Sequence, residues 1–184
     1  MTTYPIHTVE TAPEGSRPAL QRLNDALGLV PNLAATMANA PSLISTFVAA
    51  FGQLGGAGFT DGERQVLLLS NAVANRCAWA VAFHSTLALA QGVPAAEVEA
   101  IRRGGLPGDP RLAALSATTR ALIDKRGHLD DADVKTFTAG GFDEMRLLDV
   151  VTGLAVSTMA NYTGNLADPP LEPPFQAQAW HDGY

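Results

Sequence analysis

Cys77 and His84 are the two residues of this chain best suited to carry chemistry. Cys77 is the only cysteine among 184 residues, and His84 is one of four histidines. On a helix, rotation of about 100° per residue places Cys77, Ala80 and His84 on nearly one face, with Cys77 and His84 roughly 10 Å apart along the axis. That separation excludes a thiol–imidazole hydrogen bond within one helix. Ala80, one turn from His84, occupies the position that would meet the imidazole, and it offers no reactive group.

Two interpretations of Cys77 stay open. A place at a helix N-terminus next to Arg76 would favour the thiolate and make the sulfur reactive. A free cysteine is often a small buried hydrophobe, which would leave it inert.

His84 lies in an apolar stretch, so it is either a hydrogen-bonded core residue or an acid–base catalyst. A partner for its imidazole would come from the preceding helix, on which Glu63 and Gln65 are the candidates. Helical spacing places Gln65, rather than Glu63, nearer the apolar face of that helix. The Gln65 amide can orient an imidazole but cannot take its proton.

The elements that position these residues are predicted to be helices, with no convincing alternating strand. A capping box at Thr60 and Glu63, prolines at helix starts and glycines at helix ends give the boundaries. The predicted helices span Arg17–Leu27, Pro31–Ala40, Ser42–Leu54, Gly62–Ala74, Cys77–Gln91, Pro94–Arg103, Pro110–Arg126, Asp130–Ala139 and Asp143–Asn165. The last helix is apolar at Leu147, Leu148, Val151, Leu154 and Ala155.

These segments predict a single all-α domain over residues 1–184, a bundle of about seven or eight helices with its core at about 12–168. Residues 169–184 form a tail whose four prolines, at 169, 170, 173 and 174, exclude a helix at its start. The tail either wraps a neighbouring subunit or is a loosely ordered terminus.

Composition excludes several classes of function. The net charge of -6 without a Lys/Arg run argues against nucleic-acid and membrane-surface partners. No apolar run reaches the roughly 20 residues of a membrane span, and Met1–Glu10 lacks the features of a signal peptide. A single cysteine cannot form an internal disulfide, which fits a cytoplasmic protein. Neither a metal-ligand spacing nor a phosphate loop is present, so no metal or cofactor is expected.

Three arginines and two polar residues have two interpretations each. Arg102, Arg103 and Arg111 either receive an anionic substrate or form solvated helix surface. Asn161 and Tyr162, in an otherwise apolar helix, either line a pocket or hydrogen-bond across a subunit contact.

The stretch from Gly62-Glu63-Arg64-Gln65-Val66 through Asn75-Arg76-Cys77-Ala78-Trp79-Ala80 to His84 resembles the carboxymuconolactone decarboxylase and alkylhydroperoxidase D-like family. That family's core has a Glu-Arg-Glu start, an Asn-x-Cys-x-Tyr-Cys helix opening and a His four residues beyond the second Cys. Residues 29–33, 39–41 and 160–167 also look like parts of its helical core, so the resemblance covers about Ala12 to Asp168.

The resemblance implies an all-α fold and homo-oligomers such as dimers, trimers or hexamers. It assigns Cys77 to the resolving cysteine and His84 to the relay histidine. Ala80 stands at the attacking-cysteine position, Gln65 at the position of the relay Glu, and Trp79 where Tyr is usual. This is the degenerate dithiol motif of a peroxidase-related member, and dithiol peroxidase activity is therefore expected to be absent.

Three hypotheses follow for function. The first is a decarboxylase- or isomerase-like enzyme in which His84 performs acid–base chemistry on a small carboxylated or lactone substrate, with an Arg or a second acid nearby. The second is a single-thiol antioxidant oxidoreductase that uses an accessible Cys77 of lowered pKa. The third is a non-catalytic oligomer that binds a small ligand or a partner protein.

Overall fold

Residues 4–181 are described by the computed structural model, and within that range the chain is entirely helical, with no strand. The all-α prediction is confirmed: residues 4–181 contain nine α-helices, one for each of the nine predicted ranges, where the overall expectation was a bundle of about seven or eight. They are α1 (Arg17–Leu27), α2 (Asn32–Met37), α3 (Pro41–Leu54), α4 (Asp61–Ala74), α5 (Ala78–Ala90), α6 (Ala95–Arg102), α7 (Pro110–Asp124), α8 (Asp131–Ala139) and α9 (Arg146–Ala167), with 3-10 segments η1 (Glu14–Ser16) and η2 (Pro173–Gln178).

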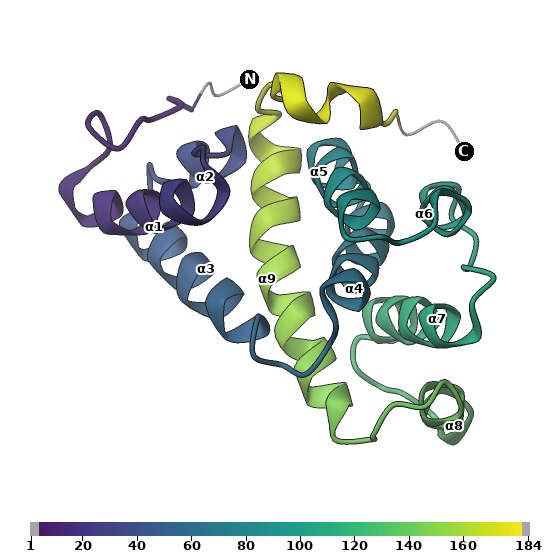
Figure 1. The fold of residues 1–184 in the computed structure, drawn as a ribbon. Coiled ribbons are helices and arrows are strands. Elements are labelled where there is room, and N and C mark those ends of the chain that lie inside the picture. Colours follow the sequence, from purple (N-terminus) through teal and green to yellow (C-terminus); the bar gives the residue numbers. More distant parts are fainter. Residues whose placement is uncertain (1–3, 182–184) are drawn as a thin grey trace.

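The long helix α9 stands in the middle of the molecule (Figure 1). Helices α1, α2 and α3 lie on one side of it, and α4 to α8 lie on the other. Both groups pack on α9, through α2 and α3 on the first side and through α4, α5 and α7 on the second. The space between the two groups beside α9 is therefore the place where a cavity can form.

Helices α4 and α5 form the hairpin that carries the motif. The predicted capping box starts α4: Thr60 Oγ1 accepts from the Glu63 N–H at 3.2 Å, and Glu63 Oε2 accepts from the Thr60 N–H at 2.8 Å. The turn between the helices has Arg76 in the left-handed region, at φ 52°, and the Cys77 N–H donates back to the Ala72 carbonyl at 3.0 Å. This helix-ending turn makes Cys77 the residue that precedes α5.

The C-terminal tail lies across the top of the bundle on its own chain through residue 181 (Figure 1), and is therefore not the loosely ordered terminus of the second expectation. Residues 169–172 are non-helical, as the prolines require, and η2 follows. Phe175 and Trp180 are buried in the common hydrophobic core, which therefore continues past residue 168. Residues 1–3 and 182–184, part of the predicted domain and tail, lie outside the described range.

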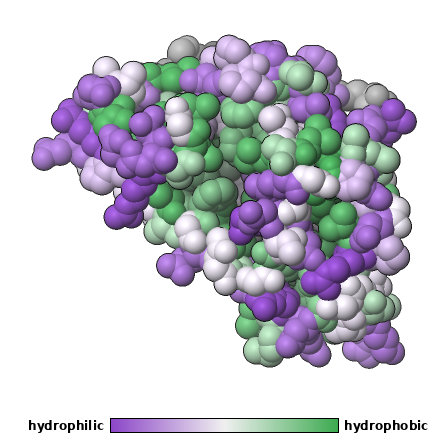
Figure 2. All heavy atoms as spheres, in the orientation of Figure 1, coloured by the Kyte–Doolittle hydropathy of each residue, from purple (hydrophilic) through white to green (hydrophobic). Residues whose placement is uncertain are grey.

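One face of α9 leaves apolar side chains in solvent. Met145, Leu148, Val151, Tyr162 and Leu166 are all exposed, with Leu148 at 66% and Leu166 at 70%. Figure 2 shows hydrophobic atoms gathered along the middle of the face on which α9 lies in Figure 1. The apolar pattern of this helix predicts that Leu148 and Val151 face the core, and the structure turns both outward. No helix of residues 4–181 is both long and apolar enough to cross a bilayer.

Candidate functional site

His84 and Gln65 form a buried pair between α5 and α4. His84 Nδ1 lies 2.9 Å from Gln65 Oε1, and both residues are buried. With the amide oxygen as acceptor, Nδ1 carries the imidazole proton and Nε2 keeps its lone pair. The structure thus confirms that Gln65, rather than Glu63, meets the imidazole.

His84 also lines a narrow apolar cavity where the two helix groups meet. The cavity has a volume of about 40 Å³, which is room for about three water molecules. Its walls come from α1, α2 and α3 on one side and from α4, α5 and α9 on the other. Among the described residues that line it, His84 and Ser157 are polar and the others are hydrophobic, including Ala80, Trp79, Phe83, Phe47 and Phe51.

His84 is uncharged in this setting. Burial away from water lowers its pKa from 6.5 to about 3, because no anion in the cavity wall offsets the cost of desolvating the imidazolium. At neutral pH the ring is therefore a neutral hydrogen-bonding group. Since Nδ1 is occupied by Gln65, Nε2 is the nitrogen available to a molecule in the cavity.

Cys77 lies apart from this cavity. Its side chain is 1% exposed and packs against α9 at Gly164, where an added Cβ would come within 2.6 Å of the sulfur. Burial raises the pKa of the thiol, an effect that the backbone N–H groups of Ala80 and Trp79 offset only in part. The structure does not bring Cys77 and His84 to one cavity, and the helix N-terminus does not produce the lowered pKa that a reactive thiol requires.

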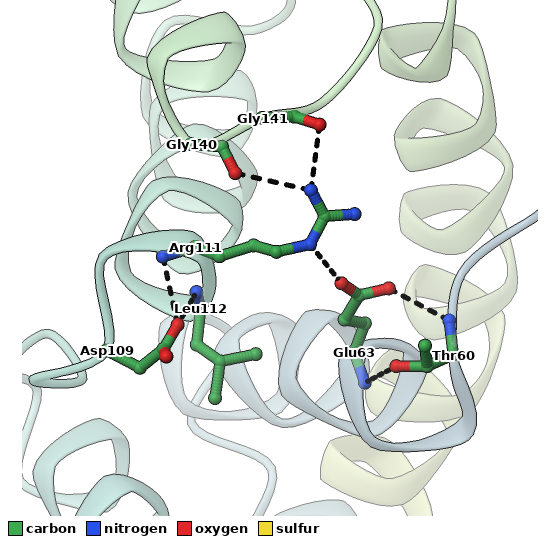
Figure 3. Close-up of polar contacts among 7 residues, drawn as sticks. All are labelled: Thr60, Glu63, Asp109, Arg111, Leu112, Gly140 and Gly141. Atoms are coloured by element: carbon green, nitrogen blue, oxygen red, sulfur yellow. Dashed lines mark hydrogen bonds and ion pairs between the residues drawn. The ribbon is translucent and has the colours of Figure 1, made fainter.

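Glu63 belongs to a different network, shown in Figure 3. Its carboxylate accepts from Arg111 Nε at 2.5 Å, and Arg111 also donates to the carbonyl oxygens of Gly140 and Gly141. Burial alone would raise the pKa of Glu63, but the Thr60 N–H and the Arg111 guanidinium together lower it. Glu63 is thus an ionised group that ties α4 to α7 and to the end of α8, away from the imidazole.

Arg102 and Arg111 both have structural partners instead of forming solvated surface. Arg102 donates to Ser85 Oγ and to the carbonyl oxygens of Gln178 and Ala179, which anchors the tail on α6. Neither arginine lines the cavity. Arg103 is exposed and pairs with Glu99.

Trp79 forms the aromatic wall of the cavity together with Phe83, at a centroid distance of 5.0 Å. Phe175 of the tail packs edge-on against both rings. Trp79 Nε1 donates to Glu172 Oε2 at 3.0 Å, and the other oxygen of Glu172 accepts from the Asn32 N–H at the start of α2. The tail therefore fixes the outer side of this wall.

The cavity contains residues that sequence reasoning did not find. Ser157 of α9 and the lining residues of α1–α3 come from segments far from the motif, and their only sequence signal was an apolar helical pattern. Asn161 is buried outside the cavity, and its Nδ2 has no hydrogen-bond partner among residues 4–181, while Tyr162 is exposed. In the same range, no group of three or more His, Cys, Asp or Glu side chains is arranged to hold a metal ion.

Residues 41–120 match the model of the carboxymuconolactone decarboxylase family. This segment contains α3 to α6, the motif, and the Gln65–His84 pair. No curated protein sequence matches the chain.

Solved structures share the whole fold. An alkylhydroperoxidase AhpD core, described as an uncharacterized peroxidase-related protein from Ralstonia eutropha JMP134, is 21% identical with a TM-score of 0.81, covering 94% of this chain and 93% of its own. A peroxidase-related protein from Silicibacter sp. TM1040 is 16% identical with a TM-score of 0.78, covering 96% and 94%. The debrominase Bmp8 in complex with 2,3,4-tribromopyrrole is 16% identical with a TM-score of 0.76, covering 97% and 95%.

Proposed function

We propose that this chain, whose residues 41–120 match the model of the carboxymuconolactone decarboxylase family, catalyses proton transfer on a small uncharged lactone, with His84 as the base. The observation that carries the proposal is the Gln65–His84 hydrogen bond at the cavity wall, which holds Nδ1 and leaves Nε2 with a lone pair toward a bound molecule.

The reaction we propose is the movement of one proton within the substrate. His84 Nε2 takes a proton from the carbon next to the lactone carbonyl, which gives an imidazolium and an enolate. The proton then returns to a different carbon, and the product is an isomer of the substrate. An imidazole of low pKa is a weak base because its protonated form is unstable in an uncharged cavity wall. In this reaction the negative charge of the enolate beside it stabilises the imidazolium.

The character of the wall favours a lactone over a carboxylate. Burying an ionised carboxylate is costly unless a cation or several hydrogen bonds compensate it. No Lys or Arg of the described residues lines the cavity, and His84 is neutral. The acid–base hypothesis for His84 expected an Arg or a second acid nearby, and neither is among the lining residues. Of the substrates in that hypothesis, the uncharged lactone is therefore favoured over the carboxylated one. The halogenated pyrrole bound by the debrominase Bmp8 is likewise a small ring.

The geometry gives less support to the two alternatives. A single-thiol antioxidant needs an accessible sulfur, and Cys77 is buried away from the cavity with a raised pKa. A dithiol reaction needs a second sulfur, and Ala80 stands where it would be. Simple ligand binding would need no convergent polar group, whereas His84 is oriented by Gln65 and faces the cavity.

Conversion of α-angelica lactone to its conjugated isomer, followed by ultraviolet absorbance, tests the proposal. His84→Ala should lower the rate about 100-fold or more, the scale of a lost general base. His128→Ala removes an exposed histidine and should leave the rate unchanged. The rate of the native protein should stay flat from pH 8 to about 4.5, because His84 remains neutral throughout. Equal rates for the His84→Ala variant and the native protein would refute the proposal.

We further propose that the chain forms a homo-oligomer through α9. The exposed Leu148, Val151 and Leu166 form an apolar face on one helix, and such faces are commonly covered by a partner subunit. Sedimentation velocity should find a dimer or larger assembly in the native protein. Leu148→Glu should shift it toward the monomer, whereas Arg103→Glu, on the exposed surface of α6, should not.

A further inference from the structure

Ser157 is the second polar side chain of the cavity that His84 lines. It lies in the inner face of α9, is 3% exposed, and lines the cavity together with His84 of α5. Because both helices contribute to the wall of this narrow cavity, a ligand inside it can contact both.

The Ser157 hydroxyl differs from the other hydroxyls of its helix. Thr152 and Thr163, also in α9, each donate back to the carbonyl four residues earlier, at 3.3 and 2.7 Å. Within residues 4–181 no such bond is made by Ser157, nor any other side-chain hydrogen bond. The Ser157 oxygen is not among the buried polar atoms that lack a partner, so it is open to the cavity, where water or a ligand can accept its hydrogen bond.

We propose that Ser157 Oγ donates a hydrogen bond to the carbonyl oxygen of the lactone while His84 Nε2 faces the adjacent C–H. This inference rests on the proposed function and deepens it, because it names a second residue and the substrate feature that the residue recognises. An uncharged donor suits a carbonyl that becomes an enolate oxygen, since the hydrogen bond strengthens as negative charge develops there.

The two polar groups together restrict the substrate class. The ligand needs an acceptor oxygen for Ser157 and, one atom away, a carbon that bears an acidic hydrogen for His84. Five-membered lactones and small cyclic ketones satisfy both requirements and are neutral. Ring ethers of the same size lack the oxygen that Ser157 recognises.

The binding test compares γ-butyrolactone with tetrahydrofuran, two rings that differ by the carbonyl, using ligand-observed NMR on the full-length protein. The native protein should bind the lactone about 3- to 10-fold more tightly, the ratio expected of one net hydrogen bond. Ser157→Ala should bring that ratio close to one. Thr158→Ala, at the adjacent exposed position, should keep the ratio of the native protein.

The kinetic test uses α-angelica lactone with the same variants. Ser157→Ala should lower kcat about 100-fold and change KM less than 10-fold, as expected when a hydrogen bond strengthens mainly in the transition state. Its thermal midpoint should not fall, because the variant removes a hydroxyl that has no protein partner. A lower midpoint with an unchanged binding ratio would assign Ser157 a structural role and overturn the inference.

The outcomes separate the two proposals. If His84→Ala abolishes turnover while Ser157→Ala keeps both turnover and the binding ratio, the role of Ser157 is refuted and the proposed function stands. If the native protein neither binds γ-butyrolactone nor isomerises α-angelica lactone, the proposed function is refuted, and the role of Ser157 with it.

Discussion

The pH dependence of stability provides a direct test of the buried, neutral His84. Its pKa in the folded protein is about 3, against about 6.5 in an unfolded chain. Between these values the unfolded chain binds a proton that the folded protein does not, so the stabilisation from neutral His84 is complete above pH 6.5. It is lost as the pH falls from 6.5 toward 3.

The size of the effect follows from proton linkage. Each pH unit below 6.5 costs about 1.4 kcal/mol of unfolding free energy until the folded pKa is reached. At pH 4.5, two units below, His84 should account for roughly 3 kcal/mol of lost stability. No charged side chain of the described residues lines the cavity to offset this loss.

His84→Gln is the matched variant, because an amide can still hydrogen-bond to Gln65 but does not titrate. Urea unfolding at pH 7.0 and pH 4.5 gives the loss of stability for each protein. Carboxylates elsewhere affect both proteins equally, so the loss should be about 2 to 3 kcal/mol smaller in the variant. Equal losses in the two proteins, or an NMR titration of the His84 ring near pH 6.5, would refute the reasoning.

Three further predictions concern the packing around the motif. Gly164→Ala should destabilise the protein by about 1 to 3 kcal/mol in urea unfolding, because the added methyl group meets the Cys77 sulfur. The second substitution Cys77→Ala should recover part of this lost stability. If it recovers none, the strain lies elsewhere. Cys77 should stay unmodified by methyl methanethiosulfonate in the native state and react only when the protein unfolds, as read by mass spectrometry, because its side chain is 1% exposed; rapid native labelling of Cys77 would contradict its burial. Arg111→Ala should lower stability by about 2 kcal/mol, because the buried Glu63 carboxylate loses its ion pair. In a Glu63→Gln background the same substitution should cost less stability. An equal cost in both backgrounds would rule out the ion pair as the cause.

Much of the fold was predictable because its signals are local. Helix boundaries depend on caps, prolines and glycines a few residues apart. Helix α1 has its predicted bounds, and α3 ends at the predicted Leu54 and starts at Pro41, one residue before the predicted start. The place of Gln65 beside His84 was predictable for a related reason. Consecutive helices joined by a short turn pack together, and helical spacing then selects the face.

The orientation of α9 was not predictable from its own pattern. The apolar pattern predicts that Leu148 and Val151 face the core. In the structure, the buried face of α9 consists instead of Val150, Gly153, Ser157 and other small residues. Gly153 is inside because Leu67 of α4 packs against its backbone. The need for a small residue at this position comes from the neighbouring helix α4. The spacing of apolar residues within α9 therefore does not reveal it.

The composition of the cavity was hidden for the same reason. His84 and Ala80 were identified from one helix, whereas Ser157 lies 73 positions beyond His84 in the chain. The packing of the tail was not predictable either, because Glu172 binds groups on two distant elements. Its partners are the indole N–H of Trp79 and the backbone N–H of Asn32 at the start of α2. Single-sequence spacing carries no information on contacts between such distant segments.

Glu172 also has a consequence for the order in which the molecule folds. Its two contacts span 93 residues to Trp79 and 140 residues to Asn32, whereas α4 and α5 are joined by a turn of three residues. Closing long loops costs more entropy than closing short ones, so the α4–α5 hairpin can form early and the aromatic wall is completed late. We therefore expect a Glu172 variant to unfold faster while it folds at nearly the native rate.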